Sequence, residues 1–230
     1  TYESIMKDSE VDQFEHYVLS KVGKYKGYSV EELCQEFDVD MSRKPKNLEA
    51  MLAYRILGIK GNKAEEFAKA NIVVKTIRIE HDGRIKENMS FPMFRFKDLV
   101  KETWEDSTFK TYLDETKFLF VVYKYDEWER LRLVGCQFWN IPYSDLEDHV
   151  QVVWNRTKHV LKEGLQIKVV NGRNTSNLPK STEDPVCHVR PHARDANDVD
   201  ELPDGRVFPK QCFWLHRDYI LSQLKDELKR

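Results

Sequence analysis

Apolar residues recur at helical spacing through the first quarter of the chain. Between residues 9 and 22 they step by three and four positions, and the stretches 29–37 and 47–56 repeat this pattern. Ser29 stands three residues before Glu32, which is the spacing of a capping box at the start of a helix. The pattern predicts three helices, each with one buried side.

The middle of the chain changes to unbroken apolar runs. Residues 71–79 are rich in β-branched side chains and lead into an Asp-Gly dipeptide, which is typical of a tight hairpin turn. Two further runs follow at 118–125 and 131–141, and Pro142 stops the second. These runs predict a sheet of at least three strands with a buried middle.

The last third of the chain alternates between amphipathic and polar segments. Residues 144–163 predict the longest helix, with Ser144 as its N-cap. The polar stretches 171–185 and 194–205 predict surface loops around a core segment, and 213–228 predicts a final amphipathic helix. Helices and strands mixed in this order favour an α/β or α+β fold with a central sheet.

Composition narrows the class of protein. A chain of 230 residues with 40% hydrophobic and 33% charged residues is globular, and it is neither disordered, collagen-like nor a disulfide scaffold. Lysine and arginine number 37 against 39 acidic residues, which excludes a generally basic surface but allows one basic face. Four cysteines without a CxxC pair and the absence of an apolar run of about 20 residues predict a cytoplasmic protein with reduced thiols and no membrane partner.

One stretch carries a pattern of catalytic chemistry. No GxGxxG, GxxxxGK[ST], GxSxG or HExxH motif occurs, so these enzyme classes have no support. Metal-dependent nucleases place an acidic residue before a strand, then a carboxylate and a lysine at alternate strand positions, where the carboxylates bind magnesium. Here Glu66 and Lys75 take the outer positions, but Val73 takes the central one and cannot bind a metal.

The stretch NIVVKTI, with EEFAKA before it and IEHDGR after it, resembles the MutH family of GATC-specific endonucleases. The earlier segment GYSVEELCQEF resembles the family's N-terminal helix, LVGCQFWNIP resembles its later strand, and VRPHA with FPKQCFWLHRDY resembles its C-terminal recognition segment, from about Gly27 to about Leu224. The resemblance is to the non-catalytic C-terminal domain of GATC-cutting type IIE restriction endonucleases. It implies a restriction-endonuclease-like α/β fold, with a central mixed β-sheet flanked by helices and a DNA-binding cleft, formed by residues 1–230 as one domain.

The resemblance also implies a function and a set of residues. The chain would bind duplex DNA containing GATC as an allosteric effector, without a cofactor, whereas Mg²⁺ would serve the parent enzyme through a catalytic N-terminal domain on the same polypeptide. The family's base-reading loop matches Arg190, Pro191 and His192, and Trp214 matches its supporting aromatic residue. Further DNA contacts are expected, from the resemblance or from charge alone, at Lys75, Arg84, Arg173, Lys180 and Arg194.

Several alternatives stay open. Arg190 could pair with an aspartate of the 195–204 segment, and Trp214 could belong to the core. The chain could be an active Mg²⁺-dependent endonuclease that uses displaced carboxylates, or a protein-interaction module that does not bind DNA. The displaced carboxylates would come from Glu80, Asp82 and Glu87, or from Glu115 beside Lys117.

Overall fold

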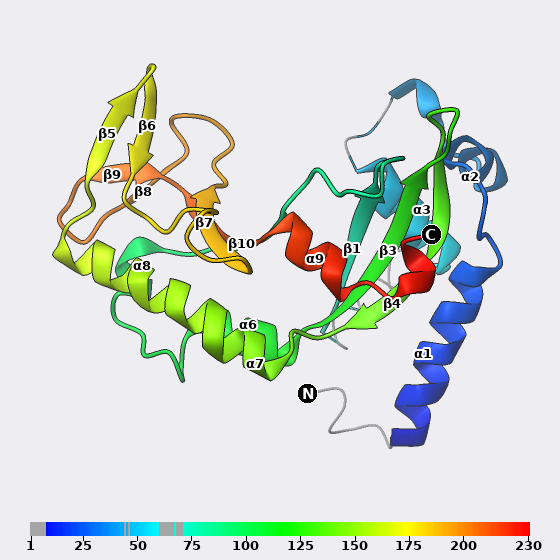
Figure 1. The fold of residues 1–230 in the computed structure, drawn as a ribbon, viewed down its shortest axis with the longest axis horizontal. Helices are drawn as coiled ribbons and strands as arrows, with labels where there is room; N and C mark the ends of the chain where they lie inside the picture. Colours follow the sequence, from blue (N-terminus) through cyan, green and yellow to red (C-terminus); the bar gives the residue numbers. More distant parts are fainter. Residues whose placement is uncertain (1–7, 44, 46, 60–66, 68–70) are drawn as a thin grey trace. The chain divides into compact units, whose positions relative to one another are not determined.

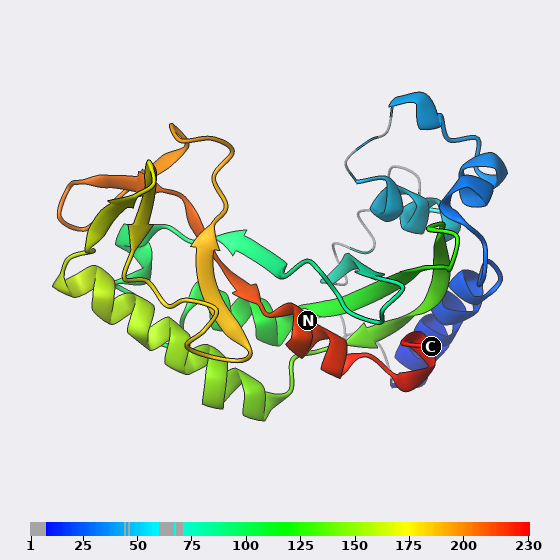
Figure 2. The same cartoon turned by 45° about the horizontal axis from the view of Figure 1, so that its top comes forward.

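The chain folds into two compact units, each built from separate stretches of sequence. The computed structural model describes residues 8–43, 45, 47–59, 67 and 71–230. Unit 1 comprises Thr1–Lys86, Glu115–Asn140 and Gln223–Arg230, and unit 2 comprises Glu87–Asp114 and Ile141–Ser222 (Figures 1 and 2).

Unit 1 is organised around a three-stranded mixed sheet. Its strands lie in the order β1 (Ile72–Ile79), β3 (Lys117–Tyr125) and β4 (Leu131–Trp139). β1 runs parallel to β3, and β3 runs antiparallel to β4. The strands predicted from the three apolar runs are therefore confirmed. The turn after β1 is also confirmed, because Gly83 adopts φ +82° and Ile79 forms a bridge with Ile85.

Three helices pack on one face of this sheet, as the apolar spacing predicts. They are α1 (Asp8–Gly23), α2 (Val30–Glu36) and α3 (Leu48–Ile56), with a short 3₁₀ helix η2 (Met41–Arg43) between the last two (Figure 1). Leu33 and Leu52 join Leu119 of β3 in the buried core between helices and sheet. The predicted capping box is present, since the Glu32 amide donates to Ser29 Oγ at 3.1 Å and the Ser29 amide to Glu32 Oε2 at 2.7 Å.

The C-terminal segment covers the other face of the sheet. Phe120 and Trp139 stack there with ring centroids 5.0 Å apart. The buried side chain of Gln137 donates to the carbonyl of Gln223 at 3.0 Å and accepts from the amide of Lys225 at 2.8 Å. These bonds fasten the last residues, including the 3₁₀ helix η4 (Asp226–Leu228), to strand β4.

Unit 2 contains an antiparallel sheet, two small hairpins and a long helix. The sheet has the order β2 (Met89–Met93), β10 (Gln211–Leu215) and β7 (Cys187–Pro191). The hairpins pair β5 (Ile167–Val170) with β6 (Arg173–Ser176) and β8 (Val199–Glu201) with β9 (Val207–Pro209). The helices are α5 (Phe96–Leu99), α6 (Thr108–Glu115), α7 (Tyr143–Asp145), the π-helical turn η3 (Leu146–Val150), α8 (Gln151–Glu163) and α9 (Arg217–Gln223).

Three expectations for unit 2 need correction. The long helical segment begins at Tyr143 after Pro142, so Ser144 lies inside its first turn and is not the N-cap. The expected helix at 213–228 is wrong at its start, because pairing with strands on both sides holds residues 213–215 in β10. The stretches expected to be loops contain strands β6 and β8.

The described residues form two three-stranded sheets and two hairpins, not one central sheet. The mixed α/β character is as expected, and the mixed sheet lies in unit 1. Within the described part of the chain, no helix has both the length and the apolar character needed to span a membrane. The four cysteines are all free thiols.

Candidate nucleic-acid interface

The pairing of β7 with β10 decides which side chains of unit 2 lie at the surface. In the register, Arg190 is opposite Cys212 and His188 is opposite Trp214. Because side chains alternate along a strand, these residues share one face of the sheet. The opposite face carries Val189 and Phe213, which are buried. The sheet therefore places Arg190 and Trp214 on the same side.

Arg190 and His192 lie on either side of the Trp214 ring. The guanidinium carbon of Arg190 lies 5.6 Å from the ring centroid, and the His192 ring meets Trp214 edge-on with centroids 5.5 Å apart. The indole Nε1 donates to the backbone carbonyl of Arg190 at 3.4 Å. Arg190, Pro191 and His192 are exposed, and Trp214 is half-buried. The structure thus brings together the tripeptide and the aromatic residue that the sequence singled out.

The acidic residues that could have paired with Arg190 are bound elsewhere. In the 195–204 segment, each aspartate forms an ion pair with another cation. The pairs are Arg194–Asp195 at 3.4 Å, Lys210–Asp198 at 2.5 Å, Arg95–Asp200 at 3.0 Å and Arg206–Asp204 at 2.7 Å. The amide of Arg194 and the ammonium of Lys210 hold the pKa of Asp198 below its usual value. Arg190 instead places its guanidinium over the Trp214 ring, and the residue is exposed.

A buried histidine lies beside this cluster. His188 is 0% exposed, and neither of its ring nitrogens has a hydrogen-bond partner. Its ring lies 6.1 Å from that of His216. Burial lowers the pKa of His188 to about 4, and the charges of Arg190 and His216 act in the same direction. His188 lies in the segment that the sequence predicts as core, and the pairing of β7 with β10 sets it opposite Trp214.

The remaining basic candidates of unit 2 lie near the ends of its strands. Arg194 is exposed just beyond β7, and its side chain pairs with Asp195. Lys180 is exposed, and its backbone amide donates to Glu183 at 3.2 Å. Arg173 begins β6, and its side chain lies outside the described residues. A role for these residues in phosphate binding stays a prediction.

The nuclease-like positions belong to unit 1. Val73 and Lys75 are half-buried and share one face of β1, where they lie opposite Phe118 and Phe120 of β3. Glu66 lies outside the described residues. Arg84 is exposed in the turn after β1 and forms an ion pair with Asp82 at 2.7 Å.

The described residues do not fit a magnesium site at this strand. Val73 offers no oxygen ligand, and no group of three or more His, Cys, Asp or Glu residues within the described part of the chain could hold a metal. Of the proposed substitutes, Glu80 pairs with Lys86 at 3.1 Å and Asp82 with Arg84 at 2.7 Å. Lys117, which follows Glu115, pairs with Glu15 at 2.5 Å.

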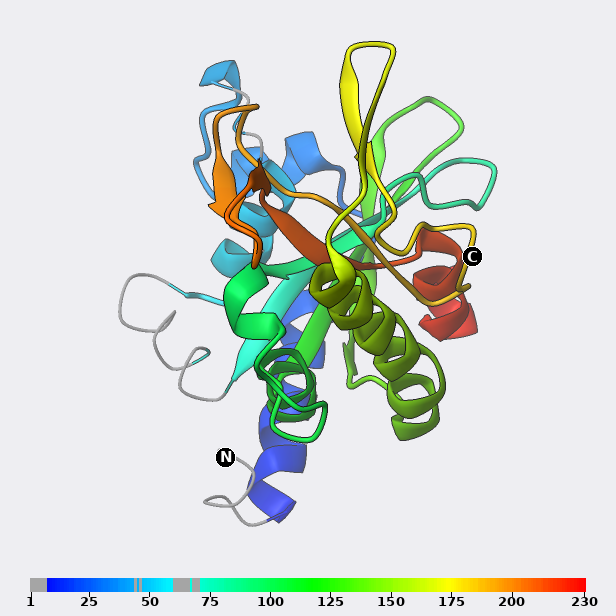
Figure 3. The same cartoon turned by 90° about the vertical axis from the view of Figure 1, so that its left-hand side faces the viewer.

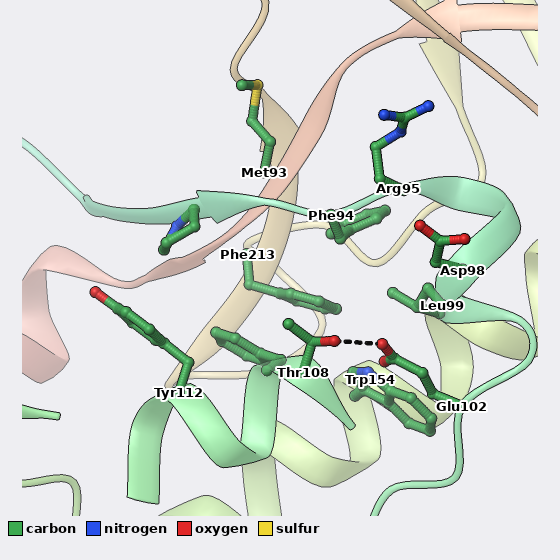
Figure 4. Close-up of a pocket in the computed structure, with 12 residues that line it drawn as sticks. Met93, Phe94, Arg95, Asp98, Leu99, Glu102, Thr108, Tyr112, Trp154 and Phe213 are labelled. Atoms are coloured by element: carbon green, nitrogen blue, oxygen red, sulfur yellow. Dashed lines mark hydrogen bonds between the residues drawn. The ribbon is translucent and has the colours of Figure 1, made fainter. Parts of the chain in front are cut away.

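The face of β10 opposite Trp214 borders a small apolar cavity. The cavity has a volume of about 200 Å³, and Phe94, Leu99, Phe109, Trp154 and Phe213 form most of its apolar wall. Figure 4 shows Phe94, Leu99, Trp154 and Phe213 around the cavity. Beside them, Thr108 Oγ1 donates to Glu102 at 2.5 Å. The Phe109 and Phe213 rings stack with centroids 4.4 Å apart. This packing supports β10 from behind the face that carries Trp214.

The segment from Met89 to Phe91 contributes to the core of unit 2, because Met89 is only 7% exposed and Phe91 only 3%. Both residues lie in β2 and pack with the core of unit 2, where the Phe91 and Phe109 rings lie 5.4 Å apart.

Comparison with known proteins agrees with the order of motifs along the chain. Residues 57–151 match the sequence profile of MutH, described as the DNA mismatch repair enzyme MutH, a family whose members have a restriction-endonuclease-like fold. The chain is also 32% identical, over an alignment 269 positions long, to the type II restriction enzyme Sau3AI of Staphylococcus aureus. That alignment covers 98% of this chain and 55% of the relative, so the chain spans about half the length of the relative. The chain therefore contains a MutH-family domain and is a homologue of a type II restriction enzyme over nearly its whole length.

Proposed function

We propose that this chain binds duplex DNA with a preference for GATC and reads the site with Arg190 and His192. The observation that carries the proposal is the exposed cluster in which Arg190 lies over Trp214. A guanidinium can donate to O6 and N7 of guanine at once, whereas an imidazole makes one such contact. The ring of Trp214 restricts the side chain of Arg190, so less conformational entropy is lost on binding. We therefore expect Arg190 to discriminate between bases more strongly than His192 does.

We further propose that the chain acts as an effector and does not cut DNA. Support comes from Val73 at the position of a metal-binding carboxylate, and from the ion pairs that engage Glu80 and Lys117. The relative is a type II restriction enzyme of about twice the length of this chain. In a longer enzyme of that kind, DNA bound here would favour the active state of a catalytic N-terminal domain on the same polypeptide, which would use Mg²⁺.

Fluorescence anisotropy without metal tests the DNA-binding proposal. The protein is titrated against a GATC duplex and a duplex with one base pair changed, at two fixed salt concentrations. We expect binding to GATC to exceed nonspecific binding by about 4 kcal/mol, as for site-reading proteins. Equal binding to both duplexes would refute sequence reading, and no binding at all would favour a protein-interaction module.

Arg190→Ala provides the residue-level test. It should weaken GATC binding by about 1–3 kcal/mol, the worth of a bidentate base contact, and should leave binding to the altered duplex nearly unchanged. Arg130→Ala is a matched control, because the guanidinium of Arg130 also lies over a tryptophan, 5.2 Å from the ring of Trp128, but in unit 1. Equal losses for the two variants would contradict the assignment of Arg190.

A further inference from the structure

The β5–β6 hairpin of unit 2 is open to solvent on both of its faces. Val169 is 70% exposed and Val170 is 52% exposed. Because successive strand residues point to opposite faces, these two valines expose apolar surface on both sides of the ribbon. Figures 1 and 3 show the hairpin extending as a free-standing ribbon beyond the end of α8.

The hairpin nevertheless has a regular turn and hydrogen bonds that hold its base. Its two-residue turn consists of Asn171 and Gly172, both with positive φ (51° and 72°), which is the geometry of a type I′ turn matched to strand twist. At its base, the Gln166 amide donates to Asn177 Oδ1 at 3.0 Å, and Arg206 donates to the Leu165 carbonyl at 2.6 Å. A two-stranded ribbon that stands alone is only marginally stable in water, so a partner that covers its exposed valines would stabilise it.

The charge of the segment indicates what covers it. Residues 164–182 contain no aspartate or glutamate, although the chain has 39 acidic residues among 230. The same segment carries Lys168 and Arg173, and Arg173 takes the position opposite Val170 in the register. A ribbon without negative charge is complementary to the phosphate backbone, and a two-stranded β-ribbon fits the major groove of B-form DNA.

We propose that the β5–β6 hairpin is a second DNA-contacting element that enters a groove of the bound duplex. Lys168 neutralises a phosphate, while Val169 and Val170 contact sugars and the methyl groups of thymine. This inference rests on the proposed DNA-binding function. It extends that function from the Arg190 cluster to a separate element of unit 2.

Two substitutions test the hairpin by anisotropy with the GATC duplex. Val170→Glu should weaken binding about tenfold, because a carboxylate would lie beside phosphates in a poorly solvated contact. Val152→Glu is the control, since Val152 is a similarly exposed valine on α8, 55% exposed. The affinity of this variant for the GATC duplex should stay within about twofold of wild type. Lys168→Gln should lower the slope of log K against log salt by about 1, the loss of one phosphate contact.

The outcomes separate the hairpin from the proposed function. If wild type binds GATC and Arg190→Ala weakens it, but Val170→Glu and Lys168→Gln both behave as wild type, the hairpin proposal is overturned and DNA binding stands. If Val170→Glu changes only self-association in sedimentation, the hairpin is a contact between copies and the proposal is also overturned. Should Val170→Glu lose its native circular dichroism spectrum, the salt slope of Lys168→Gln decides. Wild type that fails to bind DNA overturns both proposals.

Discussion

Replacing His188 with leucine should remove much of the protein's sensitivity to mild acid. The imidazole is fully buried without a hydrogen-bond partner, and its pKa is lowered to about 4 by burial and by nearby cations. In the unfolded chain the pKa returns to about 6.5. Between pH 6.5 and 4 the unfolded state therefore binds a proton that the folded state does not bind. The contribution of neutral His188 to the free energy of unfolding is complete above pH 6.5 and falls as the pH drops toward 4.

The magnitude follows from the two pKa values. The pKa of His188 is about 6.5 in the unfolded chain and about 4 in the folded protein. At 1.36 kcal/mol per pKa unit, this difference lowers the free energy of unfolding by about 3 kcal/mol when the pH lies below both pKa values. Between pH 8 and pH 5 the same relation gives a loss of about 2 kcal/mol. At pH 8, His188→Leu should be at least as stable as wild type, because the substitution removes two buried nitrogens that lack partners.

Urea unfolding at pH 8, 6.5 and 5 measures this effect. Other groups titrate over the same range, so the informative quantity is the difference in unfolding free energy between variant and wild type at each pH. That difference should grow in favour of His188→Leu by about 2 kcal/mol from pH 8 to pH 5. His159→Leu is the control, since His159 is exposed on α8 and should show no such trend. A pH-independent difference for His188→Leu would refute the reasoning.

Three further predictions concern both units. Ser29→Ala should cost about 1 kcal/mol of unfolding free energy, measured by urea titration, because it removes the acceptor of the Glu32 amide in the capping box. Phe213→Ala should cost about 3–5 kcal/mol in the same assay, since this buried ring stacks on Phe109 beside an existing cavity; a loss under about 1 kcal/mol would contradict that packing. Wild-type protein with Mg²⁺ should leave a plasmid containing GATC supercoiled on an agarose gel, because Val73 replaces a metal ligand; cleavage that Lys75→Ala abolishes would show that a displaced site exists.

The sequence predicted unit 1 well because its signals are local. The capping box at Ser29, the apolar helical spacing and the three apolar strands each depend on residues a few positions apart. In unit 2 the decisive interactions join distant residues. The segment 213–215 has helical spacing but becomes a strand because β2 and β7 flank it. No short-range pattern carries that information.

In the candidate site, too, some features can be predicted from local sequence and others depend on pairing between distant strands. Arg190, Pro191, His192 and Trp214 could be singled out by resemblance, but their contact arises from a pairing between strands about 20 residues apart. His188 lies in the segment that the sequence predicts as core, but its place opposite Trp214 depends on the pairing of β7 with β10. The β5–β6 hairpin is predictable from sequence, since the Asn171-Gly172 dipeptide after two valines is a strong hairpin signal. The polar composition of the same stretch favours a loop instead.

The interleaving of the two units has a consequence for how this protein can change over time. The chain passes from one unit to the other after Lys86, Asp114, Asn140 and Ser222. Neither unit is encoded as one uninterrupted stretch, so a single recombination event cannot exchange or delete one and keep the other whole. Strands β7 and β10 and the nuclease-like strand β1 are therefore inherited together, and substitutions that distinguish one of them, such as the valine at position 73, accumulate on one shared scaffold.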